Sequence, residues 1–180
     1  MGEIQKPKPV KLFISITYND VNIYNKVLST LKSSFGNVEK AYSYNFSSFT
    51  DYYKDEMGDS LQKTILGFES LISKEKTYLL KSFSNEIEKQ FTDSNSYPTI
   101  RKINIDPGYL TEAKIVLFTT KNFAHRIYIA NGIYAEITLT YRKYSYTSNP
   151  YTYPDYQSEG VIQFFNSLRQ LYRDQLYKLA

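Results

Sequence analysis

The sequence contains no cysteine, no tryptophan and a single histidine, His125. A chain without cysteine forms no disulfide, offers no thiolate nucleophile and holds no cysteine-based zinc site. One histidine also rules out a metal site built from several imidazoles. The absences therefore exclude disulfide-stapled domains and the common zinc proteins, and the remaining residue types identify no cofactor.

Long apolar runs are missing as well. No segment approaches the roughly 20 apolar residues that a membrane-spanning helix needs. The first residues, MGEIQKPKPVKLFISITY, have neither the apolar stretch nor the small-residue cleavage site of a secretory signal. We therefore expect a soluble, cytoplasmic protein without a membrane partner.

Length and charge set the remaining limits. With 180 residues and no linker or repeat, the chain is expected to form a single domain over residues 1–180. Lys and Arg number 22 and Asp and Glu 18, so the net charge is +4 and the sequence pI is near 9.0. This mild basicity falls short of that of a protein that coats nucleic acid.

The first 108 residues read as alternating strands and helices. Apolar alternation predicts a strand from Val10 to Thr17, and Asn19 or Asp20 then caps a helix that Gly36 ends. Further elements are expected as follows: a strand over 38–46, a loop or short helix in TDYYKDEMG, a strand over 64–68, a helix capped by Ser73 with a buried stripe from Leu79 to Phe91, a polar loop over 93–98, and a strand over 100–105 that stops at Asp106-Pro107-Gly108. The order strand-helix-strand-strand-helix-strand predicts a ferredoxin-like layer.

The segment after Gly108 is expected to extend this layer. Thr111 is suited to cap a short helix that ends near Asn122, and the alternative is a strand through KIVLFTT. A helix that begins near Ser158 closes the chain. The predicted fold is thus α+β, with a ferredoxin-like core extended by a C-terminal β-hairpin and a closing helix.

The hairpin lies in residues 125–142, and two registers are open to it. A two-residue Asn-Gly turn puts Arg126 on the apolar face. A three-residue turn pairs Ile129 with Ile133, sets Arg126 opposite Glu136 and sorts the isoleucines onto one core-facing side. We favour the second register because it keeps apolar residues together.

Five segments carry a resemblance to a known family. They read KPKPVKLF, TDYYKDEMG, INIDPGYLT, HRIYIANGIYAEITL and TYPDY. Together they resemble a bacterial family of about this length, the domain of unknown function 4416, and the resemblance covers almost the whole chain. The family has no assigned reaction, so the resemblance implies no catalytic residues. Similar proteins are sometimes labelled GTP-binding, but the chain has no G-x-x-x-x-G-K-[ST] loop to cradle phosphates, and we set that label aside.

Three residues are candidates for acid-base chemistry. Asp106, at the expected end of a strand, can act as a base or a magnesium ligand, or can accept backbone hydrogen bonds in a turn. His125, with an ordinary pKa near ~6.5, can act as an acid or base or can be a structural histidine opposite Ile137. Glu136 either forms a plain cross-strand pair with Arg126 or orients Arg126 to grip a phosphate or carboxylate.

Other side chains extend these candidates. Asp51 and Asp55 stand one helical turn apart and can hold a hard cation or simply stabilise a helix start. The six tyrosines between Tyr141 and Tyr156 can stack bases or sugars, or can pin a loop across the sheet. The candidate ligand-binding residues are Lys114, Lys121, Arg126, Tyr128, Tyr134 and Arg142.

Two functional hypotheses follow. The first is a domain that binds, or acts on, an anionic and phosphate-bearing small molecule, with Asp106, His125 and Glu136 as acid-base groups. The second is an RNA- or protein-binding module that uses a basic, tyrosine-rich face. A concave pocket that joins Asp106, Arg126 and Glu136 favours the first, and a flat basic-aromatic sheet favours the second.

Overall fold

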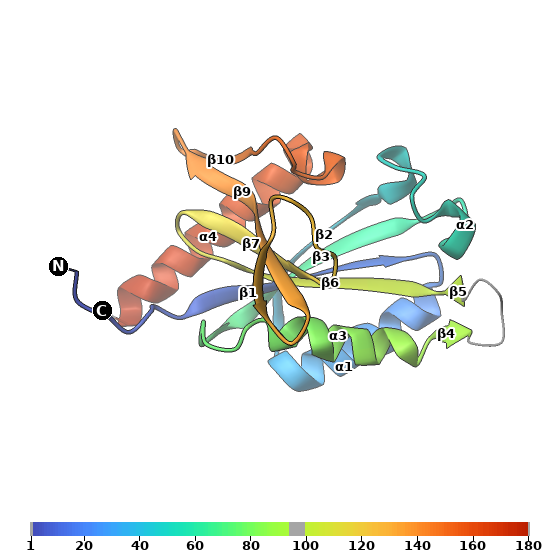
Figure 1. Cartoon of the computed structure of the whole chain (residues 1–180), viewed down its shortest axis with the longest axis horizontal. Coiled ribbons are helices and arrows are strands. Elements are labelled where there is room, and N and C mark those ends of the chain that lie inside the picture. The colour runs from blue at the N-terminus through green and yellow to red at the C-terminus, as the bar shows by residue number, and fades with distance from the viewer. Residues whose placement is uncertain (1, 94–99, 180) are drawn as a thin grey trace.

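The computed structural model describes residues 2–93 and 100–179, and within them the chain forms four α-helices around one large antiparallel sheet (Figure 1). The strands of that sheet are β1 Val10–Tyr18, β2 Val38–Asn45, β3 Gln62–Ile72, β6 Ile103–Leu110, β7 Lys114–Thr119, β8 Ile127–Ala130, β9 Ile133–Arg142 and β10 Ser145–Ser148. A small second sheet pairs β4 Thr92–Asp93 with β5 Ile100–Arg101. The helices are α1 Val21–Phe35, α2 Lys54–Met57, α3 Leu79–Lys89 and α4 Glu159–Leu179, with 3-10 turns η1 Phe46–Ser48 and η2 Pro154–Gln157.

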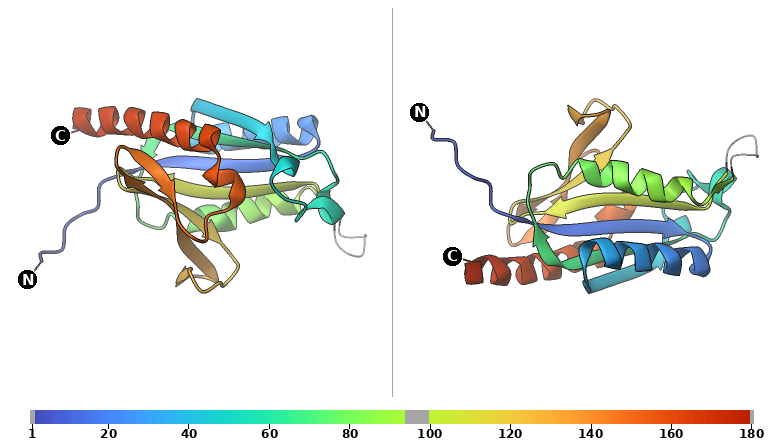
Figure 2. Two further views of the ribbon diagram at one scale, coloured as in Figure 1. Left: turned by 90° about the horizontal axis from the view of Figure 1, so that it is seen from above. Right: turned by 90° about the horizontal axis from the view of Figure 1, so that it is seen from below.

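The large sheet runs in the order β10-β9-β7-β6-β1-β3-β2, with β8 paired to β9. The α+β class is confirmed, but this eight-stranded sheet is larger than the expected ferredoxin-like layer and has a longer strand order. Helices α1 and α3 cover one face, and α4 covers the other (Figures 1 and 2). None of the helices in the described residues has the length and apolar character needed to cross a membrane.

Alternation along β1 divides the core between these two faces. Leu12, Ile14 and Ile16 pack with α1 and α3, whereas Phe13 packs with α4. Because the central strand is covered on both sides, all nine of its residues are buried.

The ends of α1 agree with the sequence prediction. The Asp20 side chain accepts a hydrogen bond from the Asn22 backbone N–H at 2.8 Å and caps the helix. Gly36 ends it with φ +86°, a conformation that favours glycine. Between these caps, Leu31 is fully buried.

Two expected helix boundaries are wrong. The helix expected from Ser73 begins only at Leu79, and the Ser73 hydroxyl instead accepts from the Glu75 N–H in a preceding turn. Of the two structures expected after Thr111, the strand through KIVLFTT is confirmed as β7 and the helix is wrong; Thr111 caps a tight turn before the strand. The run Ile-Val-Leu-Phe fits a strand here because β6 and β9 pair with it on both sides.

Strand β6 does not stop at Asp106-Pro107-Gly108 but continues to Leu110. Proline is tolerated because the ladder from β6 to β7 begins only at Gly108, paired with Leu117. The backbone N–H and C=O of Ile105 point away from β1 and bond to side chains of α3. In an antiparallel strand this direction repeats every second residue, so the backbone nitrogen of Pro107 also points away from β1. The proline therefore removes no bond from the sheet. The polar loop expected over 93–98 lies, apart from Asp93 in β4, outside the described residues.

The β8–β9 hairpin combines features of both expected registers. Ile127 pairs with Ala135 and Tyr128 with Tyr134, as in the favoured register. The turn itself is nevertheless the two-residue Asn131-Gly132 turn with positive φ at both positions, and a register shift before Ala130 reconciles the two.

The expected core-facing side of this hairpin is only partly buried. Ile133 is buried, but Ile127 is 70% exposed, and Ile129 and Ile137 are exposed as well. Figure 2 shows the hairpin projecting past α3, so the helix layer covers its base and leaves the rest open.

Candidate functional site

A cavity of about 350 Å³ lies where β6 and β7 diverge. The β6–β7 pairing ends at Gly108, and β7 stays paired with β9. Among the described residues, no strand pairs with the outer edge of the β6 segment that contains Ile105 and Asp106. Eight aromatic side chains line the cavity: Phe46, Phe49, Tyr52, Tyr53, Phe118, Phe123, Tyr153 and Tyr156. Charged side chains supply the polar lining: Lys63, Lys81, Glu88, Arg101, Asp106, Lys121, Arg126, Glu136 and Asp155.

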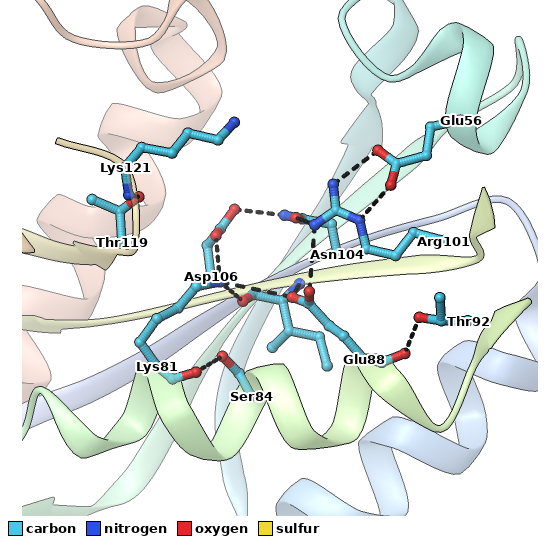
Figure 3. Close-up of polar contacts among 11 residues, drawn as sticks. Glu56, Lys81, Ser84, Glu88, Thr92, Arg101, Asn104, Asp106, Thr119 and Lys121 are labelled. Atoms are coloured by element: carbon cyan, nitrogen blue, oxygen red, sulfur yellow. Dashed lines mark hydrogen bonds and ion pairs between the residues drawn. The ribbon is translucent and has the colours of Figure 1, made fainter. Parts of the chain in front are cut away.

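Two side chains of α3 satisfy the open edge of β6. The Lys81 ammonium donates to the Ile105 carbonyl at 2.8 Å, and the Ile105 N–H donates to Glu88 Oε1 at 2.6 Å (Figure 3). Both side chains are buried, and Lys81 Nζ lies 3.7 Å from Glu88 Oε1. They take the place of a paired strand and so allow the sheet to open at this point without leaving backbone groups unsatisfied.

Asp106 is held as a carboxylate at the edge of the cavity. Lys81 Nζ lies 3.2 Å from Oδ1, and the Asn104 amide donates to Oδ2 at 2.7 Å. Burial alone raises the pKa of Asp106, but the ammonium groups of Lys81 and Lys63 outweigh it and lower the pKa below its ordinary value. The side chain is still 32% exposed, so the carboxylate is open to a ligand.

Arg101 and Glu88 close one end of the cavity. The Arg101 guanidinium grips Glu56 with two hydrogen bonds of 2.8 and 2.9 Å and donates to Asn104 Oδ1 at 2.9 Å. Its Nη1 also lies 3.4 Å from Glu88 Oε2. Burial raises the pKa of Glu88, and the charges of Lys81 and Arg101 oppose that rise. This end is a saturated ion-pair network with little capacity for a charged ligand group.

Arg126 and Glu136 form the opposite wall. Arg126 Nε donates to Glu136 Oε2 at 2.6 Å, and both side chains are only 1% exposed. The rest of the guanidinium donates to the Lys121 carbonyl and the Tyr153 hydroxyl, at 3.0 and 2.6 Å. Arg126 thus fixes the loop that carries Lys121 and orients Tyr153, whose pKa burial raises so that its hydroxyl stays protonated.

Lys121 is the cation at the mouth of the cavity. Its ammonium bonds to the Tyr52 hydroxyl at 2.6 Å and lies 4.6 Å from the centre of that ring. Among the cations that line the cavity within the described residues, Lys121 alone has no carboxylate within 4.0 Å. Its charge is therefore the least compensated in the site.

Comparison with known proteins gives one assignment. A family model described as a domain of unknown function, DUF4416, matches residues 8–172. The chain belongs to the DUF4416 family. No curated protein and no solved structure matches it. Since the family description names no activity, the function of this DUF4416 chain has to be argued from its own cavity.

The cavity gathers four of the residues singled out in the sequence. Asp106, Lys121, Arg126 and Glu136 line it, so the concave arrangement that favours small-molecule binding is present. His125 lies behind this wall: its Nε2 is 3.2 Å from Glu136 Oε2 and its ring stacks on Tyr151 at 4.2 Å.

The other candidates lie away from the cavity of the DUF4416 chain. Tyr128 and Tyr134 pack on each other on the hairpin, with ring centres 5.4 Å apart. Lys114 is at the far end of β7, and Arg142 is exposed at the turn into β10. Asp51 and Asp55 are exposed, and in the described part of the chain no three acidic or histidine side chains cluster as metal ligands.

Sequence reasoning missed the charged residues that the sheet buries. Lys81 and Glu88 lie seven residues apart, which is two helical turns, so they share the side of α3 that carries the apolar stripe. This spacing could have predicted that both charged side chains are buried. Lys63 and Asp155 form a buried pair at 2.6 Å whose partners are 92 residues apart in the sequence. No local pattern reveals such a pair.

Proposed function

We propose that the cavity between β6 and β7 binds an anionic, phosphate-bearing small molecule. The observation that carries this proposal is the weakly compensated ammonium of Lys121 at the mouth of an aromatic-walled cavity. A volume of about 350 Å³ falls in the range of roughly 300–1,000 Å³ typical of small-molecule pockets. Aromatic side chains are also typical of the walls of such sites, and most of the charged groups of this cavity are paired with one another.

Asp106 is the acid-base candidate best placed to act on a bound ligand. Its carboxylate is partly exposed at the cavity, whereas Glu136 is enclosed by Arg126 and Thr138, and His125 stands behind Glu136. In this proposal, Glu136 and His125 support the wall, and Asp106 contacts the ligand.

The alternative, an RNA- or protein-binding module with a tyrosine-rich face, has weaker support. Most tyrosines of the 141–156 segment serve internal contacts: Tyr146 and Tyr156 are buried, and Tyr153 bonds to Arg126. Tyr151 stacks on His125.

We also propose that strands β6-β1-β3-β2 with helices α1 and α3 form a ferredoxin-like unit within the larger sheet. The cytoplasmic location stays a prediction.

The test is a binding screen with a charge-deleting variant. Wild-type protein is screened by thermal melting against sugar phosphates, nucleotides and short RNAs, and hits are measured by calorimetry. Lys121→Met should weaken a phosphate-bearing hit at least ~tenfold, which corresponds to about 1.4 kcal/mol. Lys114→Met, on β7 but outside the cavity, is the matched control. Equal affinity of Lys121→Met and wild type for every hit contradicts the proposal.

A further inference from the structure

The polar groups of the cavity are arranged asymmetrically. The inner cations Lys63, Lys81 and Arg101 are each paired with a carboxylate, whereas the ammonium at the mouth has no carboxylate within 4.0 Å among the described residues. Asp106 lies on β6 in the sheet, and Lys121 lies in the segment that follows β7. Both side chains line the same cavity, and Figure 3 shows them extending from these two opposing segments. A ligand that spans the cavity therefore meets the acceptor oxygens of Asp106 at one end and the Lys121 ammonium at the other.

The inner end accepts hydrogen bonds. An ionised carboxylate offers about four acceptor positions, and Asp106 uses one on each oxygen, toward Lys81 and Asn104. The remaining Asp106 lone pairs call for donors, and they repel a phosphate.

Two further polar groups at the cavity lack partners within the described residues. The Asn85 amide lines it from α3, one helical turn after Lys81, and has no hydrogen bond there. The Tyr53 hydroxyl is likewise unbonded in the described structure. Burial and the nearby Asp106 carboxylate raise the pKa of Tyr53, which keeps this hydroxyl protonated. Such groups suit a ligand that carries several hydroxyl or N–H groups, rather than a plain hydrocarbon ring.

The outer end suits an anion. Tyr52, 66% exposed, and Phe123, 53% exposed, flank the mouth, and the Lys121 ammonium lies against the Tyr52 ring. An anion here keeps part of its hydration while it meets the cation, so its desolvation cost is smaller than at the cavity floor. The exposed rings also offer flat faces for an organic ring, which a bare inorganic ion does not use.

We infer that the ligand is a phosphate monoester of a ring that carries O–H or N–H donors, bound with its phosphate at Lys121 and its donors at Asp106. This inference rests on the proposed function and adds the ligand class and its orientation. The shared chemistry covers two sources, a phosphorylated sugar and a phosphorylated nucleoside. It gives Asp106 a direct role in ligand recognition.

The experiment compares matched probes on three proteins by calorimetry. The probes are ribose 5-phosphate, the four common ribonucleoside 5′-monophosphates, the dephosphorylated form of each, and inorganic phosphate. The proteins are wild type, Asp106→Asn and Lys121→Met, with Asp174→Asn on the exposed face of α4 as a control carboxylate. A monoester should bind wild type at least ~tenfold more tightly than both its dephosphorylated form and inorganic phosphate. Asp106→Asn should remove about tenfold in affinity, and Asp174→Asn should change nothing.

A second measurement covers the case in which Asp106→Asn does not fold. On wild-type protein, we expect a similar loss of affinity for analogues that keep the phosphate but carry a methyl group on the hydroxyl or N–H groups that would face Asp106. Tight binding by ribose 5-phosphate assigns the donors to sugar hydroxyls, and binding by nucleotides alone assigns them to the base.

Two results overturn the inference in distinguishable ways. In the first, Lys121→Met binds a monoester more weakly than wild type, Asp106→Asn binds it as tightly as wild type, and wild type binds the methylated analogues as tightly as the unmethylated compounds. The orientation is then wrong and the proposed function stands. If no phosphate compound binds wild type, the proposed function fails and the inference fails with it.

Discussion

The buried pair that closes the open edge of β6 gives the sharpest stability prediction. Lys81→Met keeps the length of the side chain but removes the ammonium that serves the Ile105 carbonyl, Glu88 and Asp106. An unsatisfied buried carbonyl costs about 1–3 kcal/mol. Breaking a buried ion pair by removing one partner costs about 3–5 kcal/mol. Arg101, 3.4 Å from Glu88, still offsets part of that carboxylate's charge, and part of the two costs overlaps because the same cavity edge relaxes. We expect a loss of about 3–5 kcal/mol in the free energy of unfolding.

Denaturant unfolding at pH 7, followed by circular dichroism, measures this loss. Lys89→Met is the matched control, because Lys89 lies on the same helix, is 70% exposed and, within residues 2–93 and 100–179, forms an ion pair with Glu86 alone. It should change the free energy of unfolding by less than about 0.5 kcal/mol.

The pH dependence provides an independent check of the same variant. Burial already raises the pKa of Glu88, and loss of the opposing Lys81 charge should raise it further. The folded state then binds the Glu88 proton more tightly than the unfolded state, so acidification stabilises it. The loss in the free energy of unfolding caused by Lys81→Met should therefore be smaller at pH 5 than at pH 7. A loss of unfolding free energy equal to that of Lys89→Met, or one that grows on acidification, would contradict this role of Lys81.

Three further predictions concern packing and the wall of the cavity. Leu31→Ala removes a fully buried side chain of α1 and should cost about 2–5 kcal/mol in a denaturant melt, whereas a loss below about 0.5 kcal/mol would mean that this face is not core. Gly108→Ala places a methyl group 2.4 Å from a backbone oxygen and 2.5 Å from the Phe13 ring, so thermal melting should show a marked loss of stability; an unchanged midpoint would contradict the close approach of β6 and β7. Arg126→Lys keeps the charge but loses the fork that reaches Tyr153, and should weaken binding of a calorimetric hit; unchanged affinity would mean that the position in which Arg126 holds Tyr153 does not matter for binding.

The sequence was most informative where local rules decide the structure. The capping of α1 by Asp20 and Gly36 and the start of α4 next to Ser158 depend on neighbours a few residues apart, and these predictions are confirmed. The Arg126–Glu136 pair was found for the same reason, since the hairpin that brings the two together is local.

The failures arise where distant segments decide. Local rules predict that a strand ends at Pro107. The strand continues because the backbone nitrogen of Pro107 faces the gap that opens where β7 leaves β6 and stays paired with β9. The same gap is the cavity, and it gathers Lys63, Lys81 and Asp155 from segments far apart in the sequence. Ile127 and Ile129 looked like core residues because periodicity reports a face and not what covers it.

The most direct test of the account is to locate the bound ligand on the protein. In a titration of ¹⁵N-labelled protein with the tightest-binding phosphate compound, amide shifts should concentrate at residues 104–106 and 119–121, on the two sides of the cavity. Shifts that concentrate on the exposed hairpin over residues 127–137, with residues 104–106 and 119–121 unchanged, would contradict the claim that the cavity between β6 and β7 is the binding site.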